Sequence, residues 1–383
     1  MKVAAYAADE GACGALRIRW PAQTLAAQGR TVTVDEPMRI AWTEAFAGTQ
    51  PPAWVHAVGV ETDADVCVFQ RPLHAQYLSV FPALQAAGVR VVVDLDDHFD
   101  AIDRGNRAWV AAEPHWLHPD ELAETEARHG AVRVTQRRPD GWAYTPDHAG
   151  RSHRLNLQAA VTMADAVTVS TPALAAHYSQ FNPNITVVPN RVPRRYLTIG
   201  RTRTESTPVT VGWTGSTDTH PRDLQVMGGA LALLKTRAFY AVVGTGIGVE
   251  RACGRRPDHA TGWVDLTREY PRAYSRMDVA VCPLRVDAFN QAKSALKPLE
   301  AAALGVVPVM SPTDEYLRLH GEGVGLIATR PKEWVAHLDA VLSDRQYRAG
   351  LAAKGLDVAA RHTIEEHAGV WWDAWTGKGS ADG

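Results

Sequence analysis

Short apolar runs rich in β-branched residues alternate with alanine- and leucine-rich stretches of helical length along most of the chain. This alternation is typical of parallel βαβ units. In the first half, strands are expected at residues 2–8, 31–34, 65–69, 90–95, 166–170 and 185–189. In the second half, strands are expected at residues 209–215, 238–244, 260–264, 279–284, 306–311 and 324–328. The pattern predicts an α/β protein.

Three stretches depart from this rhythm. Residues 198–208 are polar and have no apolar periodicity, which indicates a linker between domains. Residues 101–150 are rich in Trp, Arg, His and Pro and are too long for an ordinary connection, so they indicate a functional insertion or a partly helical cap. Residues 363–377 have a helical pattern with three tryptophans near the end, which predicts docking onto another part of the protein.

These departures divide the chain. With 383 residues and 46% apolar content, the chain can form two hydrophobic cores. We expect a Rossmann-like domain over residues 1–197 and a second Rossmann-like domain over residues 209–360. A last helix, residues 361–377, is expected to pack back on the first domain.

Composition narrows the environment of the protein. The formal net charge of -2 gives no global basic field that would drive binding to nucleic acid or an anionic membrane. No CxxC pair, signal-peptide pattern or apolar run near the ~20 residues of a membrane span is present. We therefore expect a cytoplasmic protein without a transmembrane segment, and its oligomeric state stays open. Its cysteines are far apart and fit a reducing compartment: Cys13, Cys67, Cys253 and Cys282.

The most informative segment covers residues 290–305. Asn290 is a good N-cap candidate, so a helix is expected to begin near Gln291. Lys293, Lys297 and Glu300 then fall at i, i+4 and i+7 and share one helical face. Free N–H groups at the helix start, beside two lysines, suit a diphosphate, and Glu300 could accept hydrogen bonds from a ribose diol.

The alternative for this segment is an exposed helix with a solvated lysine pair. Two like charges four residues apart destabilise a helix slightly unless an anion lies between them. The residues that follow, 301–311, are almost wholly apolar, which places the helix deep in the domain. We therefore favour the anion site.

A second candidate loop lies at residues 209–224. A predicted strand precedes Gly212 and Gly215, and then Ser216 leads through a polar turn into a helix expected near Arg222. Small residues let a ligand approach the backbone here. A plain βα turn with a surface arginine is about equally compatible with the pattern.

Two further glycine runs are less specific. Gly11 and Gly14 follow the first strand and precede Arg17 and Arg19, an arrangement found in many α/β folds. The run at residues 244–248 has the spacing G-x-G-x-G, and a tight turn after a strand explains it without a dinucleotide.

The acidic stretch at residues 94–100, DLDDHFD, follows a predicted strand. Carboxylates at the carboxyl end of a parallel strand project toward a ligand. Asp94 and Asp96 could bind a divalent cation as a D-x-D pair. Alternatively, Asp97 or His98 could orient or deprotonate an acceptor hydroxyl in a metal-free site. We favour the second interpretation because lysines and arginines already supply positive charge, and an exposed acidic loop is the third.

The pattern N-x-x-K-S-x-x-K-x-x-E, from Asn290 to Glu300, resembles the donor site of family 4 retaining glycosyltransferases. The resemblance implies a GT-B fold, in which two Rossmann-like domains face each other across a cleft. Members of the wider family carry two glutamates eight residues apart. Glu300 matches the second, which binds the nucleotide ribose, whereas Ala292 stands in the first position. Asp287 or Asn290 could replace the missing carboxylate toward the donor sugar.

The resemblance also implies roles for single residues. The leaving diphosphate would be stabilised by Lys293, Lys297 and Arg222, with Arg222 preferred to His220. The remaining donor-binding candidates are Gly11, Gly14, Gly215, Ser216, Asn290, Ser294 and Glu300. No cofactor or metal is required, and the donor would be a UDP- or GDP-sugar. A hexose would pass, with retention, to a hydroxyl of a glycan, a protein or a small molecule.

Two alternatives stay open. The absent carboxylate at Ala292 is compatible with a non-catalytic relative that only binds a nucleotide sugar. A DNA glycosyltransferase acting on a hydroxymethylated base would need a local basic and aromatic surface. Residues 101–150 offer candidates for that surface: Arg133, Arg137, Arg138 and Trp142.

Overall fold

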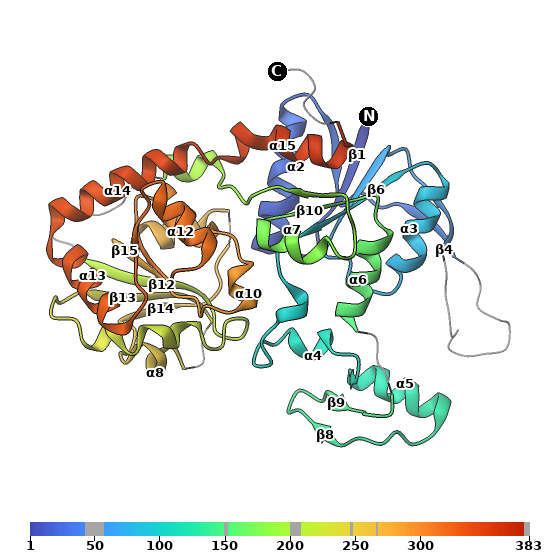
Figure 1. Cartoon of the computed structure of the whole chain (residues 1–383), viewed down its shortest axis with the longest axis horizontal. Coiled ribbons are helices and arrows are strands. Elements are labelled where there is room, and N and C mark those ends of the chain that lie inside the picture. Colours follow the sequence, from blue (N-terminus) through green and yellow to red (C-terminus); the bar gives the residue numbers. More distant parts are fainter. Residues whose placement is uncertain (43–56, 149–151, 200–207, 246–247, 266, 379–383) are drawn as a thin grey trace. The chain divides into compact units, whose positions relative to one another are not determined.

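A computed structural model describes residues 1–42, 57–148, 152–199, 208–245, 248–265 and 267–378 (Figure 1). The chain divides into two compact units, Met1–Val188 with Gly369–Gly383, and Pro189–Ala368. Each unit contains a six-stranded sheet whose strand pairs are all parallel. The expected α/β class is confirmed. The domain bounds stay a prediction, and most of the expected linker, residues 200–207, lies outside the described residues.

The sheet of the first unit has the strand order β11-β10-β6-β5-β1-β2. Its central strands β5 and β6 are buried along nearly their whole length, because helices cover the sheet (Figure 1). The sheet consists of β1 Lys2–Tyr6, β2 Thr31–Val34, β5 Val66–Gln70, β6 Arg90–Leu95, β10 Ala166–Val169 and β11 Ile185–Val187. The helices are α1 Ala12–Gly14, the π-helix η1 Ala15–Arg19, α2 Trp20–Ala27, α3 Tyr77–Ala86, the 3-10 helix η2 Phe99–Ala101, α6 His153–Met163 and α7 Pro172–Tyr178.

The expected insertion has more strand than its sequence indicates. It consists of α4 Trp109–Ala112, β7 Trp116–Leu117, α5 Pro119–His129, β8 Gln136–Arg137 and β9 Ala143–Tyr144. The strands pair antiparallel in the order β7-β9-β8 over a small core that includes Leu117, Leu122 and Ala143. Strands of two residues show no alternation, so the prediction of a partly helical cap missed them. A second antiparallel pair, β3 Arg39–Trp42 with β4 Ala57–Glu61, was also not expected.

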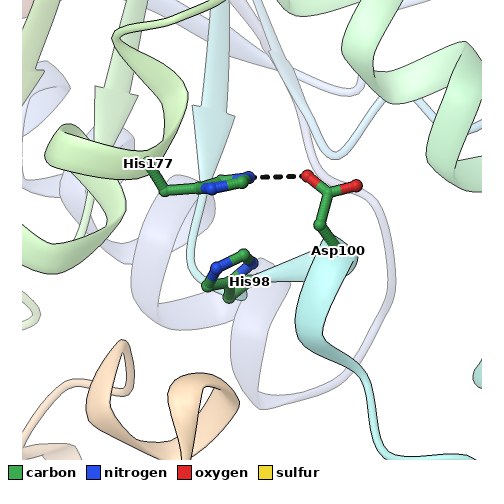
Figure 2. A group of neighbouring side chains, drawn as sticks. All are labelled: His98, Asp100 and His177. Atoms are coloured by element: carbon green, nitrogen blue, oxygen red, sulfur yellow. Dashed lines mark hydrogen bonds and ion pairs between the residues drawn. The ribbon is translucent and has the colours of Figure 1, made fainter.

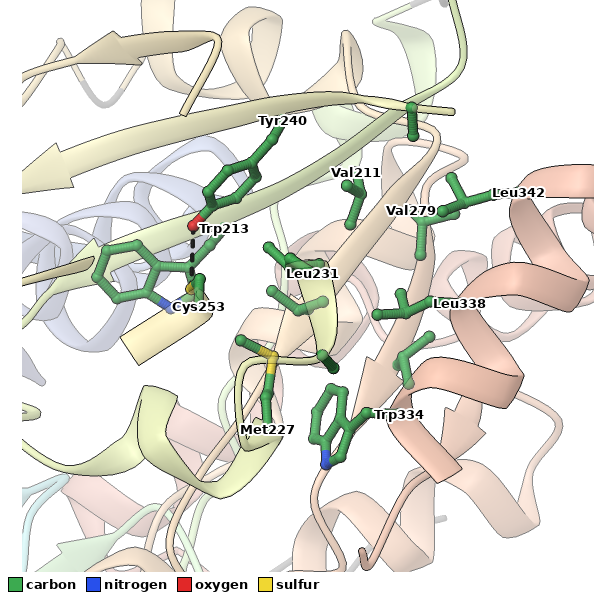
Figure 3. Close-up of a cluster of buried hydrophobic side chains, with 14 of the residues drawn as sticks. Val211, Trp213, Met227, Leu231, Tyr240, Cys253, Val279, Trp334, Leu338 and Leu342 are labelled. Carbon is green, nitrogen blue, oxygen red and sulfur yellow. Dashed lines mark hydrogen bonds between the residues drawn. The ribbon is translucent and has the colours of Figure 1, made fainter. Parts of the chain in front are cut away.

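The sheet of the second unit has the strand order β14-β13-β12-β15-β16-β17. Its core packs β12 and β15 against α13 through Val211, Val279, Trp334 and Leu338 (Figure 3). The strands are β12 Thr210–Ser216, β13 Phe239–Thr245, β14 His259–Thr261, β15 Val279–Cys282, β16 Val307–Met310 and β17 Leu326–Ile327. The helices are η3 Arg194–Thr198, η4 Asp223–Met227, η5 Ala230–Ala232, α8 Val249–Cys253, α9 Glu269–Ser275, α10 Ala288–Gln291, α11 Leu296–Ala303, α12 Asp314–Gly321, α13 Pro331–Ser343 and α14 Arg345–Ala360.

The last helix, α15 Ile364–Thr376, has residues in both units. At its start, the Ile364 N–H donates to the carbonyl of Val192 at 2.9 Å, within the second unit. Further along, the Trp371 indole N–H donates to the Arg17 carbonyl at 3.1 Å, within the first. The tryptophans of this helix are therefore buried because they supply core to a compact unit. No helix among the described residues has both the length and the apolar content that a bilayer crossing requires.

Candidate active site

The segment that carries the sequence pattern is broken in two. We expected one helix beginning near Gln291, but α10 and α11 are separated by residues 292–295. Asp287, and not Asn290, caps α10, since its carboxylate accepts the Asn290 N–H at 2.9 Å. Pro298 has no N–H to donate and is tolerated only in the first turn, so α11 begins two residues before it. The expected single helical face was wrong: Lys293 and Ser294 lie in the connection, and Lys297 and Glu300 lie on α11.

Lys297 nevertheless reaches the carboxyl end of β12. A Cβ atom at Gly215 would lie 2.7 Å from the Lys297 Nζ atom, and the Gly215 φ of +149° disfavours any other residue. Lys297 also lies over the ring of Trp213, with Nζ 5.8 Å from the ring centroid. Glycine at position 215 is therefore what admits this ammonium group beside the strand end.

Asp223 joins the loops that follow β12 and β15. Its carboxylate contacts His220 Nδ1 at 2.8 Å and accepts the Asn290 side-chain N–H at 2.8 Å and the Arg285 backbone N–H at 2.9 Å. Asn290 is buried, and its Oδ1 atom has no hydrogen-bond partner among the described residues. The amide is thus fixed in orientation with an acceptor atom left over.

The electrostatics favour an anion at this place. Burial lowers the pKa of Lys297, and the like charge of Lys293 lowers it further. Burial lowers the pKa of His220 to about 4 despite its bond to Asp223, and both lysines act in the same direction. His220 is therefore neutral at pH 7, and an incoming diphosphate would relieve the repulsion between the two lysines.

Glu300 is nearly inaccessible, with 3% of its surface exposed. The Tyr270 hydroxyl donates to its Oε2 atom at 3.0 Å, and Tyr270 in turn contacts the Thr214 hydroxyl at 3.3 Å. Burial raises the pKa of Glu300 to about 7, although Tyr270 and Lys297 pull it down. The carboxyl therefore titrates in the physiological range.

The other donor-side candidates are placed as follows. Arg222 is exposed and directly precedes η4, a 3-10 helix in place of the expected longer helix. The Ser216 hydroxyl accepts the Asp218 N–H at 3.1 Å, and the Ser294 hydroxyl accepts from the Asn190 side chain at 2.8 Å. Both lysines lower the pKa of His220, the residue that the sequence interpretation ranked below Arg222.

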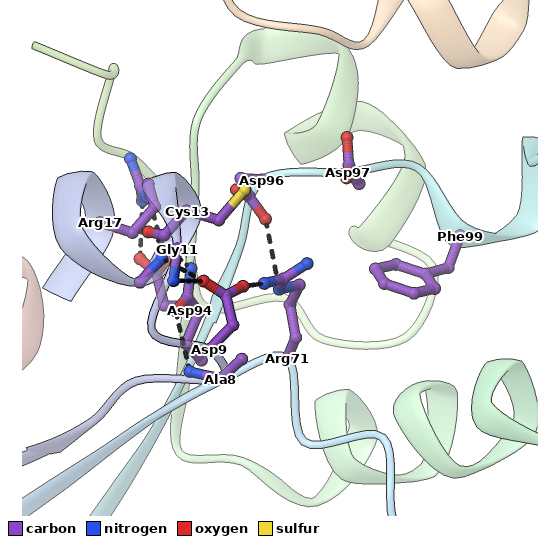
Figure 4. A network of polar contacts seen from close by, with 12 residues as sticks. Ala8, Asp9, Gly11, Cys13, Arg17, Arg71, Asp94, Asp96, Asp97 and Phe99 are labelled. Carbon is purple, nitrogen blue, oxygen red and sulfur yellow. Dashed lines mark hydrogen bonds and ion pairs between the residues drawn. The ribbon is translucent and has the colours of Figure 1, made fainter. Parts of the chain in front are cut away.

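In the first unit, Asp94 and Arg17 form a buried ion pair (Figure 4). The Arg17 guanidinium donates through Nε at 3.0 Å and through a terminal nitrogen at 2.6 Å, one bond to each carboxylate oxygen of Asp94. The Thr168 hydroxyl adds a third bond at 2.6 Å. Both oxygens of Asp94 are occupied, so this geometry does not support a D-x-D metal site with Asp96.

Beside this pair, the glycine loop closes around Asp9 (Figure 4). The Asp9 carboxylate accepts the N–H groups of Gly11 and Gly14 at 2.8 and 3.2 Å. A Cβ atom at Gly14 would lie 2.0 Å from the Asp9 carbonyl oxygen, so only glycine fits. Arg71 pairs with Asp9 and lies 3.7 Å from Asp96, and its φ of +45° is strained for a non-glycine residue.

Asp97 and His98 follow β6 directly. The backbone carbonyl of Asp97 accepts from the Tyr178 hydroxyl at 3.2 Å, which fixes the turn. The ring of His98 stacks on that of His177 with centroids 3.9 Å apart, and His177 Nε2 lies 2.6 Å from Asp100 Oδ2 (Figure 2). Asp97 and His98 therefore lie in one polar cluster at the strand ends.

Comparison with known proteins agrees with this architecture. Residues 231–372 match the family model described as glycosyl transferase-like. A sucrose-phosphate synthase from Thermosynechococcus elongatus is similar in structure, with a TM-score of 0.61, 12% identity and coverage of 99% of this chain and 100% of that chain. Anabaena HepE in complex with UDP gives a TM-score of 0.58 and 13% identity over 98% and 100% of the two chains.

The chain has the GT-B fold. A third similar structure, an E. coli trehalose-6-phosphate protein bound with UDP-2-fluoro glucose, has a TM-score of 0.56 and 13% identity over 97% and 98% of the two chains. No curated protein sequence matches the chain. The predicted GT-B fold is confirmed, and the family-model match confirms the predicted resemblance to glycosyltransferases.

Several residues of the candidate site were not predicted from the sequence. Asp223 lies in the candidate loop of residues 209–224 but was not singled out, and Arg71 belongs to no motif; their partners Asn290 and Asp96 are distant along the chain. Arg71 follows β5 directly, and the carboxyl ends of parallel strands meet at one sheet edge. That rule could have grouped Arg71 with Asp9 and Asp96. No spacing signal exists for Asp223.

Proposed function

We propose that this protein is a glycosyltransferase that moves a hexose from a UDP- or GDP-sugar to an acceptor hydroxyl with retention of configuration. The observation that carries the proposal is the position of the Lys297 ammonium group beside Gly215 at the end of β12, where Lys297 and Lys293 both act on the charge of a neutral His220. A leaving nucleoside diphosphate would supply the anion that this grouping favours. The protein would then act by positioning the reactants and stabilising charge.

The remaining groups fit the other parts of such a donor. Ionised Glu300 would accept hydrogen bonds from the ribose diol, and the unsatisfied Oδ1 of Asn290 would accept one from a donor-sugar hydroxyl. The Asn290 amide would thereby substitute for the carboxylate that Ala292 lacks. In the first unit, Asp97 or His98 would orient or deprotonate the acceptor hydroxyl.

The similar structures supply the chemical analogy. HepE was seen with UDP and glucose, and a trehalose-6-phosphate synthase with bisubstrate glycomimetics that address glycosyl transfer with retention. These complexes favour a UDP-sugar as the first donor to test and support retention for this chain. A cytoplasmic location is also proposed, because all four cysteines are free.

The charges of the insertion favour a neutral acceptor over a DNA base. Residues 101–148 contain eight Asp and Glu residues against six Arg residues. Arg133 lies 3.7 Å from Asp147, and Arg138 lies 3.3 Å from Asp140, so both are paired within the insertion. A glycan, protein or small-molecule hydroxyl therefore suits this unit better than a polyanion.

Lys297→Ala tests the proposal. Transfer from UDP- and GDP-sugars, measured by mass spectrometry, should fall by about 100-fold or more, while the variant stays folded by circular dichroism. The matched control is Lys332→Ala, at an exposed position on α13, which should keep full activity. Full transfer by Lys297→Ala would exclude the donor site, and a parent chain that binds but never transfers would show a non-catalytic relative.

A further inference from the structure

Outside the donor side, two imidazoles and one carboxylate meet near the end of β6. They come from three different segments: His98 from the turn after the strand, Asp100 from η2 and His177 from α7 (Figure 2). One ligand atom from each residue lies within 4.8 Å of the other two. None of the three was expected from the sequence to act as part of a metal site.

The packing leaves a buried ring nitrogen of His98 available to a ligand beside the His177–Asp100 pair. His98 Nδ1 is buried and has no hydrogen-bond partner among the described residues. The ring of His98 is held by its stack on His177, with an interplanar angle of 35°. An unsatisfied buried nitrogen is costly unless something binds it. The stack thus holds one nitrogen donor next to the His177–Asp100 pair.

The surroundings resemble the second layer of a metal site. The Gln158 side-chain N–H donates to Asp100 Oδ1 at 2.6 Å, which orients the carboxylate and leaves Oδ2 toward His177. Arg154 lies 4.0 Å from Asp100 and 3.6 Å from Glu113, so the guanidinium is shared between two carboxylates. The local charge therefore does not forbid a cation.

We propose that His98, Asp100 and His177 bind one zinc-class divalent cation. Two imidazole nitrogens and a carboxylate oxygen are a ligand set that Zn²⁺ accepts, with a fourth position open to water or to a substrate oxygen. Zinc–ligand bonds of about 2.0–2.1 Å at a tetrahedral angle place two ligand atoms about 3.3–3.4 Å apart. The His177–Asp100 contact of 2.6 Å would therefore widen by about 0.7 Å. The cation would lie on the acceptor side, and Asp97 would remain as the candidate base.

This site is independent of the donor site. In the proposed transfer reaction, the positive charge that stabilises the leaving diphosphate comes from Lys293 and Lys297 in the second unit. Loss of the metal site therefore leaves that proposal intact. The metal test is therefore a binding measurement and not an assay of transfer. Each proposal can fail without the other.

The test is zinc uptake by the full-length chain after treatment with a chelator. Titration calorimetry with ZnCl₂ should show one bound ion per chain, and Co²⁺ should give the visible absorption of a four-coordinate site. His98→Phe keeps a ring to stack on His177 but removes the ligand nitrogen, and should weaken binding at least 10-fold. His177→Ala should do the same.

The control is His153→Ala, which removes a histidine whose ring contacts His74 in the same unit and which lies outside the cluster. Its zinc affinity should equal that of the parent. Absence of stoichiometric uptake by the parent would overturn the proposal. Unchanged affinity in the folded His98→Phe variant would overturn it equally, because the bound ion would then lie elsewhere.

Discussion

Both units hold a cation at the carboxyl ends of their strands, fully buried in the first unit and half-buried in the second, and the two cations have different surroundings. In the first unit, Arg17 faces Asp94 with two hydrogen bonds, and both side chains are fully buried. In the second unit, Lys297 lies among an aromatic ring, a second lysine and a neutral histidine. The charge of Arg17 is neutralised by Asp94 without a ligand, whereas a bound anion would reduce the repulsion around Lys297. The comparison separates a charge that holds the fold from a charge that is available for chemistry.

The largest effect is expected when Arg17 and Lys297 are each replaced by methionine and the free energies of unfolding of the two variants are compared. Arg17→Met leaves Asp94 buried without its partner and should lower the free energy of unfolding by about 3–5 kcal/mol. Lys297→Met removes a half-buried charge whose pKa is already lowered, and should leave stability unchanged or slightly higher. Urea unfolding followed by circular dichroism measures both. Equal losses in the two variants would break the distinction.

The next largest effect is expected from the ionisation of Glu300, which should make the free energy of unfolding depend on pH. Its pKa is raised from 4.5 to about 7 in the folded protein, so between these values the folded chain keeps a proton that the unfolded chain has lost. The stabilisation is complete below pH 4.5 and is lost as the pH rises through about 7. By linkage, the contribution amounts to about 3 kcal/mol.

Glu300→Gln removes this titration. The stability of the parent relative to Glu300→Gln should therefore fall as the pH rises from 4.5 to 7.5, because all other titrations are shared. Chemical unfolding at several pH values gives this difference directly. A difference that stays constant over the range would mean that Glu300 is already ionised in the folded state.

The sequence predicted the parallel strands of each unit better than the segments that connect them. Every strand of both parallel sheets overlaps a predicted apolar run, because buried parallel strands leave a continuous hydrophobic signal. The break between α10 and α11 was not predicted. It depends on the choice of Asp287 over Asn290 as the cap, and both residues are good caps by composition.

In the candidate site, the sequence predicted charged candidates but not their burial or their partners. The pattern from Asn290 to Glu300 pointed to Lys297, which does lie by Gly215. Sequence alone could not tell that Arg17 is fully buried, since its partner Asp94 is 77 residues away. The low pKa of His220 likewise comes from burial in the tertiary structure. Charge roles therefore required the fold, whereas strand positions did not.

The smallest effect is expected for the binding of inorganic pyrophosphate, which tests whether the cation of the second unit is the one available to an anion. An anion that binds the folded second unit stabilises it by mass action, about 1.4 kcal/mol at roughly ten times its Kd. The melting temperature of the parent should rise with pyrophosphate, and Lys297→Ala should abolish the rise because the lysine pair is lost. Arg71→Gln removes a cation that is already paired with Asp9 in the first unit, so the rise should persist. A rise that survives Lys297→Ala but disappears in Arg71→Gln would assign the anion site to the first unit instead.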